Sequence, residues 1–300
     1  MKYSTNTVII GAGMAGMTAA IYLKRANIDF VIIESSAPGG QINRSSNVEN
    51  YPGFESVDGP TLALNTYEQL TKLGVEITFG YVNEIYINGN KKYVKLESAE
   101  YECENIVLAT GRSPKELGLE NERNLVGHGI SWCAYCDGYL YKDKIVSVVG
   151  GGNSAFEEAL FLSNICKKVY LIHRRDTFRA SKLLQEKVFS KSNIELITNE
   201  EIKKLIVEND YLKGLALNKR KVEVSGLFIY IGSVPNIDLV KNLNINLENN
   251  YIVVDKNMET NIEGIYACGD IVSKNLYQLT TAVGEGSTAA SSIILKSNTR

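Results

Sequence analysis

Hydrophobic segments separated by a glycine-rich turn organise the first part of the chain. Residues 7–10 are apolar and mostly β-branched, and they end at a glycine-rich segment, residues 11–16. Apolar residues at helical spacing follow over residues 17–24, and a second apolar run covers residues 30–33. This order predicts a βαβ unit, in which a parallel sheet binds a dinucleotide at the turn after its first strand.

The same pattern recurs in the middle of the chain. An apolar run at residues 144–149 leads into a glycine-rich turn at residues 150–155, followed by a helical stretch at 156–163 and a strand at 169–172. A shift of 139 positions superposes Gly11 on Gly150 and carries one unit onto the other. We therefore predict an α/β protein with two Rossmann-like dinucleotide-binding domains.

Further elements are expected outside the two repeated units. The pattern predicts helices over residues 59–73 and 284–295, and strands within 75–97 and at 106–109 and 264–267. These segments flank the second repeated unit on both sides, so we expect them to complete the domain that the first unit begins.

Two segments that combine glycine with proline bracket the second unit. They lie at residues 110–114 and 231–235, and such segments are typical of linkers to an inserted domain. We expect a discontinuous domain of residues 1–112 and 235–300. The second domain, residues 113–234, is inserted into it.

Composition limits the possible functions. The 300 residues suggest about two domains, and a net charge of −2 with a pI near 5.9 argues against binding to nucleic acid. No apolar run approaches the length of about 18 residues that a membrane helix needs, and the N-terminus has no secretory signal pattern. We expect a soluble, cytoplasmic protein.

The first glycine turn has the residue types that a pyrophosphate requires. Gly11 permits a tight bend, Gly13 lets backbone N–H groups approach the phosphates, and Gly16 lets the helix lie close to the strand. Glu34 follows 23 residues after Gly11, where such units place an acid that binds a ribose. The alternatives are a flexible loop and a solvated acid at the end of a strand.

The second glycine turn has no acid at the corresponding position. Gly150, Gly152 and Ala155 repeat the pattern, but His173 occupies the place of Glu34. Three guanidinium groups follow it, those of Arg174, Arg175 and Arg179. Guanidinium groups at this place attract the 2′-phosphate of NADP, which indicates a phosphorylated nicotinamide nucleotide. The alternative is a basic, solvated start of a helix.

Cys133 and Cys136 are separated by two residues, and Asp137 follows them. The pair could be half of a zinc site, an inert pair or a reversible dithiol. Zinc needs about four nitrogen or sulfur ligands, and the chain has only two histidines and no second close pair of cysteines, so the dithiol is favoured. Asp137 would donate or accept a proton, or cap a turn. The remaining cysteines lie in apolar surroundings and are expected to be inert: Cys103, Cys166 and Cys268.

In this order the motifs resemble, nearly end to end, the low-molecular-weight thioredoxin reductases. The resemblance also covers Gly39-Gly40-Gln41, residues 49–54, Ala109-Thr110-Gly111 and the segment from Gly264 to Asp270. It implies an FAD enzyme in which NADPH reduces the flavin, the flavin reduces the cysteine disulfide and the dithiol reduces thioredoxin. It also implies a homodimer, and rotation of the NADPH domain between the steps.

The resemblance assigns the site residues. The FAD site would comprise Gly11, Gly13, Gly16, Glu34, Gly40, Gln41, Asn50, Thr110, Gly111, Gly269, Asp270 and Ala289. The NADPH site would comprise Gly150, Gly152, Asn153, Ser154, Ala155, His173, Arg174, Arg175 and Arg179. Cys136 would face the flavin, Cys133 would attack thioredoxin, and Asp137 would act as the acid and base.

Other functions are compatible with the same fold. An FAD-dependent dithiol oxidase would keep the cysteine pair but have a degenerate NADP fingerprint, which is intact here. A flavoprotein reductase linked to ferredoxin or flavodoxin would not need the pair. A nucleotide-binding scaffold without activity would show no thiol-dependent turnover.

Overall fold

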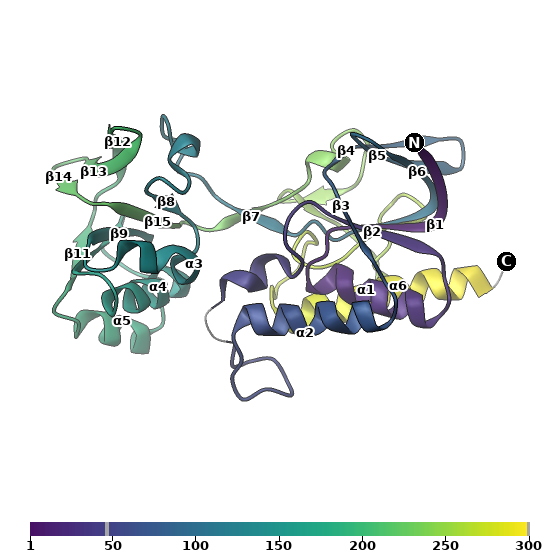
Figure 1. The fold of residues 1–300 in the computed structure, drawn as a ribbon, viewed down its shortest axis with the longest axis horizontal. Coiled ribbons are helices and arrows are strands. Elements are labelled where there is room, and N and C mark those ends of the chain that lie inside the picture. Colours follow the sequence, from purple (N-terminus) through teal and green to yellow (C-terminus); the bar gives the residue numbers. More distant parts are fainter. Residues whose placement is uncertain (46–47, 299–300) are drawn as a thin grey trace. The chain divides into compact units, whose positions relative to one another are not determined.

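The computed structural model describes residues 1–45 and 48–298, and the chain forms two compact units (Figure 1). Unit 1 combines Met1–Ser113 with Val234–Arg300, and unit 2 is Pro114–Ser233. Each unit contains a parallel sheet with helices against it, which confirms the predicted α/β class. Among the described residues, no helix has the length and hydropathy needed to cross a membrane.

The sheet of unit 1 has seven strands in the order β3-β2-β1-β6-β5-β4, with β19 beside β6. Their bounds are β1 (Lys2–Ile10), β2 (Phe30–Glu34), β3 (Ile77–Phe79), β4 (Val82–Asn88), β5 (Lys91–Leu96), β6 (Glu100–Leu108) and β19 (Ile265–Ala267). The first half of β6 pairs antiparallel with β5, and its second half pairs parallel with β19. One long strand therefore joins the parallel core to an antiparallel ribbon.

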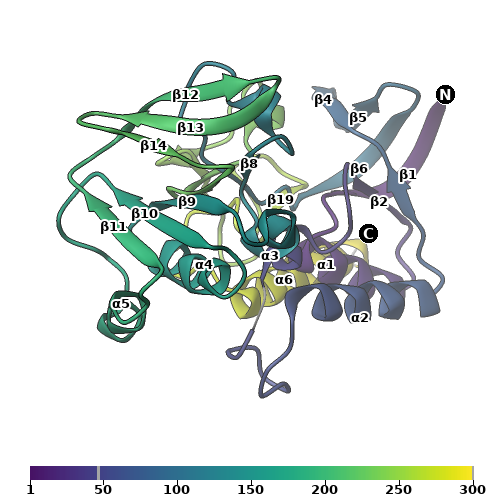
Figure 2. The same cartoon turned by 60° about the vertical axis from the view of Figure 1, so that its left-hand side comes forward.

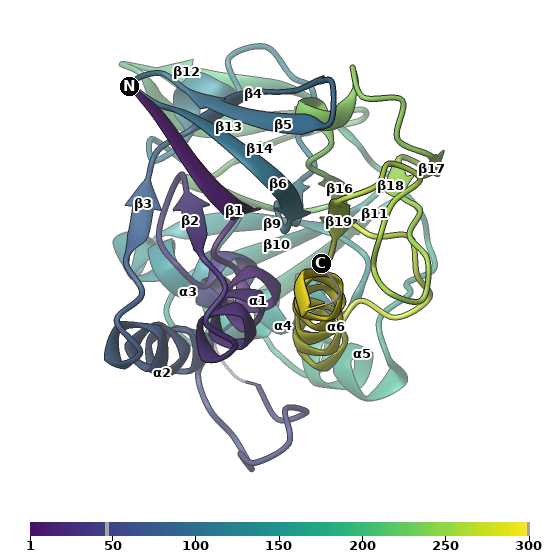
Figure 3. The same cartoon turned by 90° about the vertical axis from the view of Figure 1, so that its right-hand side faces the viewer.

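Three helices lie against this sheet in unit 1: α1 (Met14–Arg25), α2 (Gly59–Lys72) and α6 (Leu279–Asn298). Figure 3 shows α1 between α2 and α6, beneath the strands. Asp58 caps α2, because its Oδ1 accepts the Thr61 N–H at 2.9 Å. The apolar faces of the helices and of the sheet form one core that contains Met17, Leu23 and Ile293, all fully buried.

Unit 2 has a five-stranded parallel sheet in the order β11-β10-β9-β15-β8 and a separate antiparallel sheet, β12-β13-β14 (Figure 2). The parallel strands are β8 (Ile130–Ser131), β9 (Ile145–Gly150), β10 (Lys168–His173), β11 (Ile194–Thr198) and β15 (Gly226–Tyr230). The antiparallel strands are β12 (Ile202–Glu208), β13 (Tyr211–Leu217) and β14 (Lys221–Glu223). The helices are α3 (Ala134–Asp137), α4 (Asn153–Ser163) and α5 (Lys182–Phe189).

The two chain segments that connect the units run side by side. β7 (Arg112–Pro114) pairs with β16 (Ser233–Pro235). Within unit 1, the Thr110 hydroxyl donates to the Asn236 carbonyl at 2.9 Å, and the Asn236 amide donates to the Thr110 carbonyl at 2.7 Å. These bonds tie the two linkers together where they leave unit 1.

Short elements complete the chain. The 3-10 helices are η1 (Gly40–Arg44), η2 (Arg123–Leu125), η3 (Gly138–Tyr141) and η4 (Asp238–Val240). A small hairpin pairs β17 (Leu247–Glu248) with β18 (Tyr251–Ile252).

Two helices begin earlier than the sequence pattern predicts. α4 starts at Asn153 rather than at residue 156, and α6 starts at Leu279 rather than at residue 284. Glycine lowers helix propensity, which hid the first turn of α6. The structure shows why Gly286 is needed there: a Cβ on it would overlap the backbone oxygen of Ala15 in α1.

We predict opposite effects for two glycine substitutions in α6. Gly286→Ala should lower the free energy of unfolding of unit 1 by about 1–3 kcal/mol, because the added methyl group forces α6 away from α1. Gly284→Ala is the matched control: it adds its Cβ in open space and should raise stability by about 0.5–1 kcal/mol. Urea unfolding followed by circular dichroism measures both, and equal effects would contradict the close contact of the helices.

Candidate functional site

The first glycine turn joins β1 to α1 in unit 1. Gly11 has φ +102°, and a Cβ there would overlap the carbonyl oxygen of Ala109. A Cβ on Gly16 would overlap the Gly11 oxygen. Gly13 differs, because its Cβ would lie 3.9 Å from the nearest atom, the Gly39 oxygen. The first and third glycines thus allow close approach of backbone, whereas Gly13 leaves open space at the N-terminus of α1, where an anion binds best.

Residues from distant segments converge on this turn. The Gly39 N–H donates to the Ala12 carbonyl at 2.8 Å, which places Gly40 and Gln41 next to the first turn. The Gln41 side-chain amide lies 3.5 Å from Asp270 Oδ2. A Cβ on Gly111 would lie 3.9 Å from the same amide, so this segment also borders the site. A cradle lined largely by backbone and small residues fits an extended dinucleotide.

Two predicted polar residues already have partners within unit 1. The Glu34 carboxylate accepts the backbone N–H of Ala12 at 2.7 Å and that of Ser36 at 2.8 Å, so it lies against the glycine turn. The Asn50 amide donates to Gln278 Oε1 at 2.9 Å. Gln278 is a neighbour of the site that the sequence analysis did not identify.

An ion pair supports the peptide before Asp270. Glu285 Oε2 accepts the Gly269 N–H at 2.8 Å and a hydrogen bond from Lys274 Nζ at 2.6 Å. Lys274 Nζ also donates to the Gly269 carbonyl at 2.8 Å. Both side chains are mostly buried, with 12% and 15% exposed, so the pair holds Gly269 at both of its backbone groups. No local motif announced it. Ala289 is fully buried in the core, and its contact with a flavin stays a prediction.

The second glycine turn, in unit 2, has the same division of roles. A Cβ on Gly150 would overlap the Tyr230 carbonyl oxygen and crowd Ala155, which is fully buried. A Cβ on Gly152 would meet no atom within 4 Å. Asn153 Oδ1 accepts the Ser181 N–H at 2.9 Å, while Ser154 is exposed. This turn too is tight at its first glycine and open where a pyrophosphate would lie.

The basic segment after β10 folds back onto the second turn. The His173 ring covers Gly151, whose added Cβ would overlap it, and the Arg179 N–H donates to the Gly151 carbonyl at 2.7 Å. Burial lowers the pKa of His173, and the neighbouring arginines lower it further. Arg174, Arg175 and Arg179 are exposed. Their guanidinium groups are therefore available to a phosphate beside the turn.

The Cys133–Cys136 pair forms a disulfide at the start of α3. Cys133 is the N-cap residue, and its Sγ accepts the Cys136 N–H at 3.1 Å. Cys133 is 7% exposed, whereas Cys136 is an exposed residue. One sulfur of the pair is thus sheltered in this state and the other is accessible.

Asp137 is held beside this disulfide by a residue outside the motif. The Ser131 hydroxyl donates to Asp137 Oδ2 at 2.6 Å and accepts the Cys133 N–H at 2.9 Å. Ser131 thus connects the carboxylate to the backbone of the first cysteine. The sequence analysis did not identify Ser131, because its role depends on a turn that closes only in the folded chain.

The other three thiols are buried and unreactive. Burial raises the pKa of Cys103 and of Cys268 to about 12 and that of Cys166 to about 11, so none is a thiolate at neutral pH. The part of the chain that the structure describes contains no group of three or more metal-ligating side chains. The geometry thus favours a redox pair over half of a zinc site.

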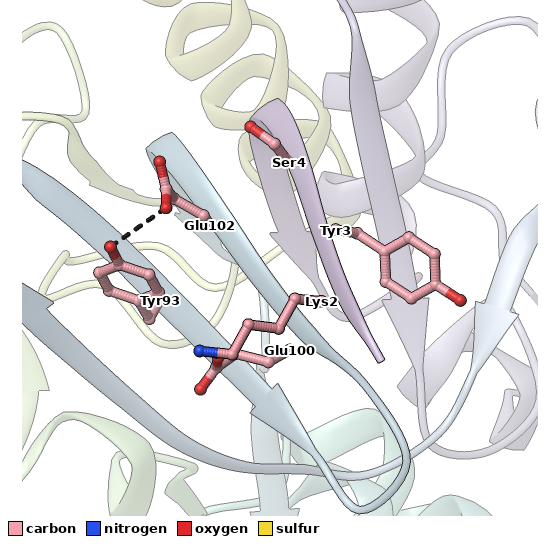
Figure 4. A pocket seen from close by; sticks show the side chains of 6 residues that line it. All are labelled: Lys2, Tyr3, Ser4, Tyr93, Glu100 and Glu102. Atoms are coloured by element: carbon pink, nitrogen blue, oxygen red, sulfur yellow. Dashed lines mark hydrogen bonds and ion pairs between the residues drawn. The ribbon is translucent and has the colours of Figure 1, made fainter.

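A pocket on the sheet of unit 1 carries no comparable chemistry (Figure 4). It is lined by Lys2, Tyr3, Ser4, Tyr93, Glu100 and Glu102. Glu100 pairs with Lys2 at 3.0 Å and accepts the Tyr86 hydroxyl at 2.8 Å, and Glu102 accepts the Tyr93 hydroxyl at 3.1 Å. Because both carboxylates have partners, we assign this pocket no function.

We predict that only the cysteine pair reacts with a maleimide in the folded protein. The native, oxidised protein should take up no label, and mild reduction with dithiothreitol should expose two thiols. Denaturation should then expose all five, because only unfolding removes the burial that suppresses the other three thiolates. Mass spectrometry counts the adducts, and rapid labelling of a third cysteine before denaturation would contradict this prediction.

Comparisons with known proteins agree with this geometry. Residues 5–286 match the family described as pyridine nucleotide-disulphide oxidoreductase. Thioredoxin reductase of Bacillus subtilis (strain 168) is 41% identical over 294 residues, which are 96% of this chain and 93% of that protein. Thioredoxin reductase of Lactococcus lactis in the FR conformation superposes with a TM-score of 0.89 at 36% identity, over 97% of this chain and 99% of that one.

A more divergent structure has a different name. It is a ferredoxin-flavin thioredoxin reductase from Clostridium acetobutylicum, with a TM-score of 0.57 and 30% identity over 100% of both chains. The family match and the curated relative both extend over nearly the whole sequence. This chain belongs to the pyridine nucleotide-disulphide oxidoreductase family and, within it, to the thioredoxin reductases.

Proposed function

We propose that this protein is an NADPH-dependent thioredoxin reductase that contains FAD. The observation that carries the proposal is the position of the disulfide in unit 2. The Cys133 turn follows β8, the second glycine turn follows β9, and the basic segment follows β10, all strands of one parallel sheet. Carboxyl ends of parallel strands lie at one edge, so the disulfide and the candidate nucleotide site share that edge.

Unit 1 has the residues to hold FAD. The N-terminus of α1 at Gly13 suits the pyrophosphate, and Glu34 suits a ribose. Gln41, Asn50 and Asp270 would bind the polar parts of the rest of the molecule. Bound FAD would supply the two-electron step between nicotinamide and disulfide. The chain itself positions the partners and limits the access of water.

Unit 2 has the residues to hold NADPH. The open space at Gly152 suits its pyrophosphate, and the exposed guanidinium groups beside the turn suit the 2′-phosphate. Since this site and the disulfide belong to unit 2, and the FAD site to unit 1, each must reach the flavin in turn. We propose that the paired linkers β7 and β16 permit the rotation that this exchange requires.

The thiol chemistry balances as two successive exchanges. NADPH and a proton reduce the Cys133–Cys136 disulfide to two thiols, and these reduce thioredoxin while their own disulfide re-forms. In the proposal Cys136 faces the flavin and Cys133 attacks thioredoxin, so Cys133 must become accessible once the disulfide opens. Asp137, fixed by Ser131, would transfer the protons.

A protein substrate is supported by the surface beside the disulfide. Tyr139 and Leu140 follow the motif directly and are 70% and 64% exposed. Exposed apolar side chains next to a reactive group are typical of a protein interaction site. The family resemblance further supports a homodimer in the cytoplasm.

The alternative functions explain fewer features. A dithiol oxidase would not need the arginines that lie against the second turn, and a reductase that feeds ferredoxin or flavodoxin would not need the cysteine pair. Both features are present here, and together they favour transfer from NADPH to a protein disulfide.

The decisive experiment is anaerobic mixing of the FAD-loaded protein with NADPH, followed by addition of thioredoxin. NADPH should bleach the yellow absorbance, and oxidised thioredoxin should restore it. Cys136→Ser should still be bleached but lose at least about 99% of thioredoxin reduction, since one of the two exchanging sulfurs is gone. Cys166→Ala, a change at a thiol outside the motif, should keep both activities. Full turnover by Cys136→Ser would overturn the proposal.

The arginines should determine the preference for NADPH over NADH. Arg174→Ala combined with Arg175→Ala should raise the KM for NADPH about 10- to 100-fold, because each lost charge-assisted hydrogen bond is worth about 1.5–3 kcal/mol. The KM for NADH should change less than about twofold. Arg123→Ala, which removes an exposed arginine paired with Glu116 in the same unit, is the control. An unchanged preference for NADPH would refute the role of the arginines.

A further inference from the structure

The first turn of α3 is held by a contact from outside the cysteine motif. The Ala134 N–H donates to the Tyr230 hydroxyl oxygen, with an N···O distance of 2.9 Å. Tyr230 is the last residue of β15, which pairs with β8, the strand that leads into α3. A helix of four residues is not stable alone. The contact therefore helps to fix the peptide that lies between the two sulfurs.

Tyr230 connects this peptide to a carboxyl group on α4. A tyrosine hydroxyl donates one hydrogen bond and accepts others: that of Tyr230 accepts from Ala134 and donates to Glu158. Oε2 of Glu158 is buried and has no hydrogen-bond partner among the residues that the structure describes. Burial raises the pKa of Glu158 to about 7, and Glu157 raises it further, while the Tyr230 hydrogen bond lowers it. A carboxyl group with so little compensation is costly to bury, so its presence requires an explanation.

Two backbone N–H groups of this turn have contrasting partners. That of Cys136 points to a sulfur, Cys133 Sγ, at 3.1 Å. That of Ala134 points to Tyr230 instead. Backbone donors stabilise a thiolate, and a nearby carboxylate destabilises it. The tyrosine thus occupies a donor that a thiolate could use, and the glutamate places negative charge behind it.

We propose that Glu158 and Tyr230 act together as positioning residues that keep the Cys133–Cys136 pair strongly reducing. Reduction adds two electrons and two protons to the S–S bond, and ionisation of one thiol then releases a proton and leaves negative charge on its sulfur. Because the pair disfavours that charge, it disfavours the reduced form and lowers the reduction potential. The inference rests on the proposed function in that a strongly reducing dithiol passes its electrons on more readily.

The test is the reduction potential of the disulfide in the FAD-containing protein. The protein is equilibrated with mixtures of reduced and oxidised dithiothreitol, and free thiols are trapped with a maleimide and counted. Tyr230→Phe and Glu158→Gln should each shift the equilibrium about tenfold toward the dithiol, which equals about 30 mV for this two-electron couple. The double variant should shift no further than the larger single change, because both residues act through one contact.

Two variants in the same unit serve as controls. Tyr170→Phe removes a hydroxyl on β10, and Glu186→Gln removes an exposed charge on α5; neither should move the potential. Unchanged potentials in both test variants, or shifts toward the disulfide, would overturn the inference. If Tyr230→Phe fails to fold, Glu158→Gln decides alone. Since the measurement needs neither NADPH nor thioredoxin, an unchanged potential leaves the proposed function standing, and a failure to reduce thioredoxin leaves the potential measurable.

Discussion

The close approach of each first helix to the adjoining strands is the constraint on which both candidate nucleotide sites depend. In unit 1 there is no room for a side chain at Gly11 or Gly16, and in unit 2 there is none at Gly150. Only with these contacts does the helix N-terminus come level with the end of the sheet. The backbone donors of that terminus then face open space at Gly13 and Gly152. Steric exclusion at one glycine thus creates the binding surface at the next.

The redox pair depends on the fold in a different way. The motif fixes two sulfurs near one another, but α3 is a single turn and has little stability of its own. Ser131, on the strand before it, and Tyr230, on a neighbouring strand, hold its backbone from two sides. The environment of the sulfurs is therefore set by the sheet of unit 2, and a CxxC sequence placed elsewhere would not inherit it.

Local patterns predicted the parts of the structure that local forces determine. The strand, turn and helix around Gly11 and around Gly150 could be predicted because apolar runs and glycine spacing express them directly. The Lys274–Glu285 pair and the link from Glu158 through Tyr230 could not, since their members lie in different elements that only the tertiary fold brings together. The antiparallel sheet β12-β13-β14 was also missed, because its short strands carry no glycine fingerprint.

The burial of Cys103, Cys166 and Cys268 has a consequence for fidelity. A protein that repeatedly opens and closes one disulfide risks mispairing whenever another thiolate comes within reach. Here each spare sulfur lies inside a core and remains protonated, so it cannot intercept a mixed disulfide during exchange. Catalytic cycling can continue without the off-pathway cross-links that an exposed fifth cysteine would invite.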